Sequence, residues 1–331
     1  MVRHQLPQIV SGISAIGRYL LSYFHGLSRA LFFAFYRMES PRGALRTALA
    51  RKQRATPNEK PLLIHYHIFK NAGTSFEWAL EQTLGRVLLR LDSASQAGFV
   101  SAREIARYVA AHPEITAIAS HQAAPPPPQI RGRRVLTSIL LRDPLARIRS
   151  IYVFERKQIS NSPGAQKAKE FDFKGYVEWR LATTPRMFCN YQVHFCCRDG
   201  SPSKSPVTQT ELARAITALD EIEIVGTVER YEEWLRLAES ILADSFPSIV
   251  LAPVRRNPTR SAPPLSEAEV LSQLERELGS GLAHELIERN ELDMSLHQVA
   301  DALLTRRLAE RGISIKLRDA YESARGPQGS D

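Results

Sequence analysis

A short loop near residue 70, with one lysine and one glycine, separates an apolar run from a helix-like pattern. The apolar run covers 62–69, Lys70 and Gly73 lie in the loop, and Thr74 and Ser75 begin the expected helix. Backbone N–H groups of the loop and first helical turn lack intrahelical partners, and the helix dipole favours negative charge there. The pattern therefore predicts a cradle for a phosphate-like anion, with Lys70 as a mobile positive charge.

This loop differs from the Walker A loop of nucleotide triphosphatases. That loop reads G-x-x-x-x-G-K-[ST], with the lysine directly before the hydroxyl residue. Here Lys70 precedes Gly73, and no glycine stands four residues before the lysine. The sequence thus predicts a shorter cradle.

A second segment supports an anion site. The aliphatic run 135–142 is typical of a buried strand and leads into Arg142, Asp143 and Pro144. Asp143 is suited to cap the helix that follows, with proline at its first position. Arg142 at the strand end and Ser150 two turns into the helix are placed to hold a second phosphate, because a guanidinium binds two oxygens at once.

The two segments together resemble the nucleotide-binding motifs of sulfotransferases. The run from His67 to Ser75, H-I-F-K-N-A-G-T-S, is similar to their 5′-phosphosulfate loop, often written H-I-P-K-T-G-G-T-S. The run from Leu141 to Tyr152 resembles their 3′-phosphate motif, R-D-P-x-x-R-x-x-S-x-Y. The resemblance is to the carbohydrate branch, which includes heparan sulfate 2-O-sulfotransferases and bacterial relatives, and it covers roughly residues 61–260.

Three positions depart from the family pattern. Phe69 replaces the usual proline, and Asn71 and Ala72 replace threonine and glycine. Ala72 restricts φ where glycine would not. Gly73 is retained, so a close approach of the backbone to the sulfate end is still expected. A degenerate, non-catalytic copy of the cradle is the alternative.

The resemblance implies a donor, a reaction and a set of binding residues. The donor is 3′-phosphoadenosine 5′-phosphosulfate (PAPS), used without a metal, and the acceptor is a hydroxyl of a carbohydrate or glycolipid. Lys70 would stabilise the leaving phosphate during in-line transfer. The expected nucleotide-binding residues are Lys70, Asn71, Ala72, Gly73, Thr74, Ser75, Arg142, Ser150, Arg255 and Arg256.

The acceptor hydroxyl needs a base, and His121 is the leading candidate. It follows the strand-like run 115–120, and in the resembled branch a histidine after a comparable strand takes this role. An ordinary histidine pKa near ~6.5 suits proton removal at neutral pH. Glu77 and His67 are weaker candidates. The segment from Asn190 to Gln192 resembles a family segment near the acceptor.

Two other function classes stay open. A non-catalytic nucleotide or anionic-glycan binding module at a membrane surface would keep Arg142 and Ser150 but would not need His121. A P-loop kinase shares the expected fold, but the missing Walker A pattern disfavours it. Magnesium dependence separates the kinase from the sulfotransferase.

Charge and cysteine content limit the remaining possibilities. Of the net charge of +9, residues 1–58 carry +8, from nine Arg or Lys and the single acid Glu39. No nucleic-acid-binding motif accompanies this basic segment, so no nucleic-acid partner is expected. Three cysteines form no C-x-x-C pair, which argues against zinc and for a reducing, cytoplasmic compartment.

The chain divides into five expected parts. They are a basic amphipathic helix at 1–38, a linker at 39–60, a sulfotransferase domain at 61–262, a helical C-terminal extension at 263–322 and a disordered tail at 323–331. Apolar residues at helical spacing between 9 and 37 fit a membrane interface, docking on the domain, or a targeting segment. The last three readings stay open.

The order of elements predicts the fold class. The pattern alternates between strands and helices: strands at 62–69, 87–92, 115–120, 135–142 and 222–227, and helices at 74–84, 101–111, 144–159, 172–183, 186–197, 209–219, 229–243 and within 265–311. Such alternation predicts an α/β protein with a P-loop-like central parallel sheet flanked by helices. Both motifs then lie at carboxyl ends of strands, where such sheets bind ligands.

Overall fold

The computed structural model describes residues 60–85, 88–95, 98–198, 207–251 and 267–314. The amphipathic helix at 1–38, nearly all of the linker, Arg255, Arg256 and the tail at 323–331 lie outside the described residues.

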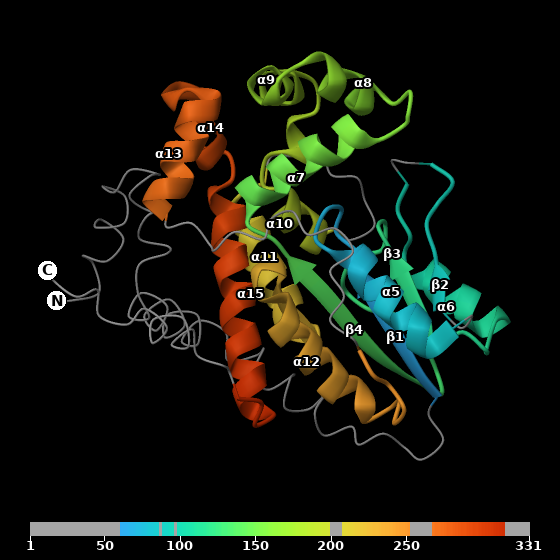
Figure 1. Ribbon diagram of the computed structural model, residues 1–331. Helices are drawn as coiled ribbons and strands as arrows, with labels where there is room; N and C mark the ends of the chain where they lie inside the picture. Colours follow the sequence, from blue (N-terminus) through green and yellow to red (C-terminus); the bar gives the residue numbers. More distant parts are fainter. Residues whose placement is uncertain (1–59, 86–87, 96–97, 199–206, 252–266, 315–331) are drawn as a thin grey trace, which may run out of the picture.

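A five-stranded parallel sheet forms the centre of the molecule (Figure 1). The strand order is β2-β3-β1-β4-β5, and every neighbouring pair is parallel. The strands are β1 (Lys60–Tyr66), β2 (Leu88–Arg90), β3 (Ala117–Ser120), β4 (Arg133–Leu141) and β5 (Ile224–Thr227). The sequence-based prediction of a five-stranded parallel α/β sheet is therefore confirmed, with strand ends shifted by a few residues.

The chain leaves β1 and β4 toward opposite edges of the sheet, which makes a topological switch point between these two strands. From β1 the chain passes through α5 (Gly73–Leu84) to β2 on one side of the sheet. From β4 it leads to β5 on the other side. The carboxyl ends of β1 and β4 are adjacent, with Tyr66 opposite Ile139. Open α/β sheets bind ligands at such a point, and both predicted motifs begin there.

Helices cover both faces of the sheet. The central strand β1 therefore buries side chains on both faces, as central parallel strands do. Leu63 packs with the apolar sides of α5 and α12 (Tyr231–Ala243). Leu62, Ile64 and Tyr66 pack on the opposite face. The helices on that face are α6 (Ala102–Ala111), α10 (Tyr191–Cys196), α11 (Gln209–Glu221) and α15 (Glu291–Glu310).

A third apolar cluster lies beyond the carboxyl end of β4, where Figure 1 shows a group of helices above the sheet. Ile148, Tyr176 and Leu286 are among its buried residues. It is built from α7 (Pro144–Lys157), α8 (Pro163–Glu170), α9 (Phe173–Thr183), α13 (Glu267–Leu278) and α14 (Ser280–Glu288). None of the helices in the described ranges is long and apolar enough to cross a membrane.

Two helix predictions need correction. The predicted helix at 186–197 is divided into a 3₁₀ turn, η2 (Pro185–Met187), and α10. Asn190 between them has φ 46°, a left-handed conformation that asparagine tolerates, and it bonds to Asn290 and Asp293. Helix α8 was not predicted, although Ser162 caps it and Pro163 occupies its first turn.

Candidate active site at the carboxyl edge of the sheet

The loop between β1 and α5 is tightly wound. Lys70 and Ala72 both have left-handed backbone conformations, with φ 67° and φ 60°. The Asn71 N–H donates to Ile68 O at 3.1 Å, and α5 begins at Gly73. Within the described residues no side chain caps this helix, and its first turn holds no acid. The partial positive charge of its N-terminus is therefore available to an anion.

Replacing Ala72 with glycine is expected to stabilise the protein by about 1 kcal/mol, because a left-handed conformation costs an L-residue roughly 1–2 kcal/mol and the greater freedom of unfolded glycine offsets part of the gain. Urea unfolding measures the change. The matched control is Ala79→Gly, in the interior of the same helix, which should destabilise by about 1 kcal/mol. Equal losses in both variants would contradict the conformation at Ala72.

Buried amides tie this loop to the end of β4. Asn71 Nδ2 donates to Leu140 O at 2.9 Å and to Gln192 Oε1 at 2.8 Å. Gln192 also accepts from Arg142 N at 2.9 Å and donates to Arg142 O at 2.7 Å. The sequence prediction placed the Gln192 segment near the acceptor. In the structure Gln192 is fully buried and joins the two predicted motifs.

Two arginines donate to backbone carbonyls of the loop, and the lysine of the loop itself extends toward α7. Arg142 donates to Lys70 O at 3.1 Å, and Arg147 donates to Phe69 O at 3.1 Å. Lys70 Nζ lies 4.3 Å from the ring centroid of Phe154. Burial, and then the charge of Arg142, lower the pKa of Lys70. Among the described residues, Arg142 Nε and one terminal nitrogen of Arg147 are buried with no hydrogen-bond partner.

Other predicted binding residues lie on the helices that follow the two motifs. Thr74 is exposed in the first turn of α5, and Ser75 is half-buried beside it. Ser150 is buried in α7, one turn beyond Arg147. Arg147 has no role in the sequence-based predictions, although it occupies the arginine position of the resembled motif. The structure therefore brings Lys70 and Arg142 together and adds Arg147.

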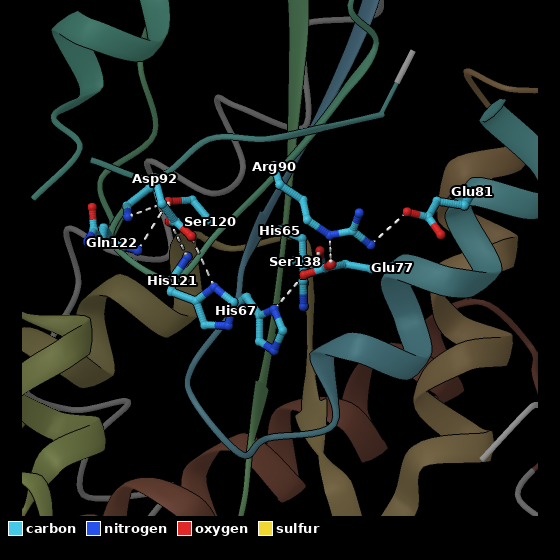
Figure 2. Close-up of polar contacts among 11 residues, drawn as sticks. His65, His67, Glu77, Glu81, Arg90, Asp92, Ser120, His121, Gln122 and Ser138 are labelled. Carbon is cyan, nitrogen blue, oxygen red and sulfur yellow. Dashed lines mark hydrogen bonds and ion pairs between the residues drawn. The ribbon is translucent and has the colours of Figure 1, made fainter. Parts of the chain in front are cut away.

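A cluster of histidines lies beside the loop, at the ends of β1 and β3 (Figure 2). His67 bonds through Nδ1 to Glu77 at 2.5 Å, and Glu77 accepts from Arg90 at 2.6 Å. Burial alone would raise the pKa of Glu77, but the hydrogen bonds from His67 and Arg90 lower it to about 2. Glu77 is thus a poor proton acceptor at neutral pH and anchors His67 instead.

His121 is anchored by an aspartate that the sequence analysis overlooked. Its Nδ1–H donates to Asp92 Oδ2 at 3.2 Å, and its backbone N–H donates to Asp92 Oδ1 at 2.8 Å. This leaves Nε2 as the proton-accepting atom. Burial, and then His67, lower the pKa of His121, while Asp92 opposes this shift. Asp92 ends the predicted strand 87–92, so its position at the ligand edge was a usable signal.

The third histidine of the cluster, His65, has a structural role. His65 bonds to Ser138 at 3.0 Å, and burial lowers its pKa to about 3, so it is neutral. Gly73 leaves room for His67, because a Cβ at Gly73 would lie 2.2 Å from His67 Cδ2. Retention of Gly73 in the sequence predicted a close approach of a ligand to the backbone. In the structure an imidazole occupies that space.

Within the described ranges, no group of three or more His, Cys, Asp or Glu could hold a metal ion.

Comparison with known proteins shows which family the chain belongs to. No protein-family model matches the chain. An "Uncharacterized protein" of Archaeoglobus fulgidus is 30% identical over 239 residues, which cover 71% of this chain and 94% of the archaeal protein. The fold and site define an α/β protein with a candidate anion site at its switch point, and the chain belongs to the same family as this archaeal protein.

Proposed function

We propose that the protein is a PAPS-dependent sulfotransferase. The observation that carries this proposal is the meeting of Lys70, Arg142 and the uncapped N-terminus of α5 at the switch point of the sheet. Buried guanidinium nitrogens without partners among the described residues support it, because unpaired buried donors are costly unless a ligand satisfies them. The loop would serve as a P-loop-like cradle for the 5′-phosphosulfate, and Arg142 with Ser150 would hold the 3′-phosphate.

The same residues suggest a reaction path. His121 Nε2 removes the proton of an acceptor hydroxyl, and the oxygen forms a new bond to sulfur. The bond between sulfur and the bridging phosphate oxygen breaks, and its electron pair leaves with 3′-phosphoadenosine 5′-phosphate. Lys70 stabilises the charge that develops on that phosphate. The side chain of His121 is 43% exposed, which suits contact with an acceptor.

The acceptor and cell compartment belong to the proposal as well. A hydroxyl of a carbohydrate or glycolipid fits the resemblance to the carbohydrate branch, and no metal is required. The protein would act in the cytoplasm. There the basic segment 9–37, outside the described residues, would reach a membrane surface, dock on the domain or direct targeting.

Calorimetric titration with 3′-phosphoadenosine 5′-phosphate tests the proposal. Wild type should bind at micromolar concentration, and Arg142→Ala should weaken binding by about 2 kcal/mol, roughly 30-fold, because a charged hydrogen-bond pair is lost. Lys70→Ala should weaken it as well.

Lys174→Ala, an exposed lysine on α9, is the matched control and should bind like wild type. Binding that persists in EDTA separates a sulfotransferase from a kinase. Absence of binding by folded wild-type protein would overturn the proposal.

A further inference from the structure

The sheet register forces two histidines to lie side by side. Tyr66 on β1 is opposite Ser120 on β3, and the His67 N–H donates to Ser120 O at 2.9 Å. His67 directly follows β1, and His121 directly follows β3. Their rings are therefore neighbours, stacked with centroids 4.0 Å apart and planes inclined by 30° (Figure 2).

Each ring of the stack is fixed at its Nδ1 edge by a different carboxylate. Glu77 on α5 holds His67, and Asp92, which follows β2, holds His121. The two anchors are themselves held. Arg90 donates to Glu77, and Ser120 Oγ donates to Asp92 at 2.9 Å. Figure 2 shows Glu77 and Asp92 on opposite sides of the stacked pair.

The inner ring has no freedom to move away from the outer one. His67 is buried, and its ring fills the space next to the Cα of Gly73. The outer ring, His121, is partly open to solvent. A charge on the inner ring is therefore felt by the outer ring across a fixed and short separation, and little water intervenes to screen it.

We infer that His67 and His121 form a coupled pair that carries no more than one positive charge near neutral pH, in which His67 is a positioning residue that keeps Nε2 of His121 unprotonated and ready to accept a proton. The role of the outer ring as a base rests on the proposed function. The coupling itself does not, because two adjacent imidazoles titrate as a pair whatever the enzyme transfers.

The charged groups around the pair favour this arrangement. They are His65 on β1, Glu77 and Glu81 on α5, Arg90 on β2 and Asp92 after it. His67 lowers the pKa of His121, whereas Asp92 and Glu77 raise it. The lowering effects of burial and of His67 are larger than the raising effects of the two carboxylates, so the pKa of His121 is lowered. Removal of the His67 imidazole should therefore raise the pKa of His121, and removal of the Asp92 charge should lower it further.

Proton NMR of the imidazole Cε1–H signals in the full chain tests the inference, with His121→Asn used to assign the outer ring. In wild type the His121 signal should titrate below the ordinary histidine range. In His67→Phe, which keeps an aromatic ring over Gly73, the His121 titration should move to higher pH. Asp92→Asn should move it to lower pH.

An unchanged His121 titration in folded His67→Phe would overturn the inference. His67→Gln serves as a second variant if the phenylalanine protein does not fold. These measurements require neither PAPS nor an acceptor. A coupled pair in a protein that does not bind 3′-phosphoadenosine 5′-phosphate would therefore reject the proposed function and leave the pair intact.

Where sulfuryl transfer is found, the acid limb of its pH–rate profile gives an independent readout. That limb should shift to higher pH in His67→Phe. A purely structural role for His67 would lower the rate at every pH and leave the limb in place, and that result would overturn the inference.

Discussion

Gly73→Ala is expected to destabilise the protein by about 3 kcal/mol, at the upper end of the usual cost of overpacking. A Cβ at this position would lie 2.2, 2.3 and 2.5 Å from three ring atoms of His67. The His67 ring cannot easily move away from the added Cβ, because Glu77 bonds to one edge of the ring and His121 stacks on its face. Relief of the clash requires either movement of α5 or loss of the His67–Glu77 hydrogen bond.

Urea unfolding measures this loss, and NMR of the imidazole signals reports whether His67 has moved. Gly281→Ala in α14 is the matched control. A Cβ built there has open space outside its chain neighbours and the backbone of its own helix, so the substitution should stabilise the protein by up to about 1 kcal/mol. A Gly73→Ala protein as stable as wild type, with unchanged His67 signals, would contradict the packing described here.

Asp293→Ala is expected to destabilise the protein by about 3 kcal/mol or more. The buried carboxylate of Asp293, on α15, accepts from Gln192 N at 3.0 Å and from Val193 N at 2.8 Å. Alanine would leave both donors buried and unpaired, at about 1–3 kcal/mol each. It would also remove a negative charge near Arg147, which is buried.

The same substitution should weaken nucleotide binding, because Gln192 holds both Asn71 and Arg142. Unfolding in urea and titration with 3′-phosphoadenosine 5′-phosphate measure the two effects. Asp293→Asn keeps a carbonyl oxygen as an acceptor, so it should lose less stability than the alanine variant. Wild-type stability in Asp293→Ala would show that α15 does not support the site.

Local sequence patterns were sufficient to predict most elements of the fold. Short apolar runs and helical periodicity predicted all five strands and their parallel arrangement, because alternating strands and helices leave few other topologies. The helix at 163–170 was missed because it is only eight residues long and buries small residues such as Ala165 and Ala168. Its Ser162 cap and Pro163 were the available signals.

The site was predictable only in part. Lys70 and Arg142 stand out because each follows an apolar run directly, and carboxyl ends of parallel strands share one edge of the sheet. Their partners do not stand out. Gln192 lies 121 positions from Asn71, and Asp293 lies 101 positions from Gln192. No local periodicity marks residues that meet only through packing of distant helices.

The sequence by itself determined the elements and the residues at the ends of β1 and β4, because these depend on interactions between near neighbours in the chain, and the alternation of strands and helices predicted the parallel sheet. The tertiary structure decided which strands are adjacent and in which register. That register places His67 against His121, and the packing of α5 gives His67 its carboxylate. Strand register is fixed by the burial of whole faces at once, so it emerges only when the complete sheet and its helices come together.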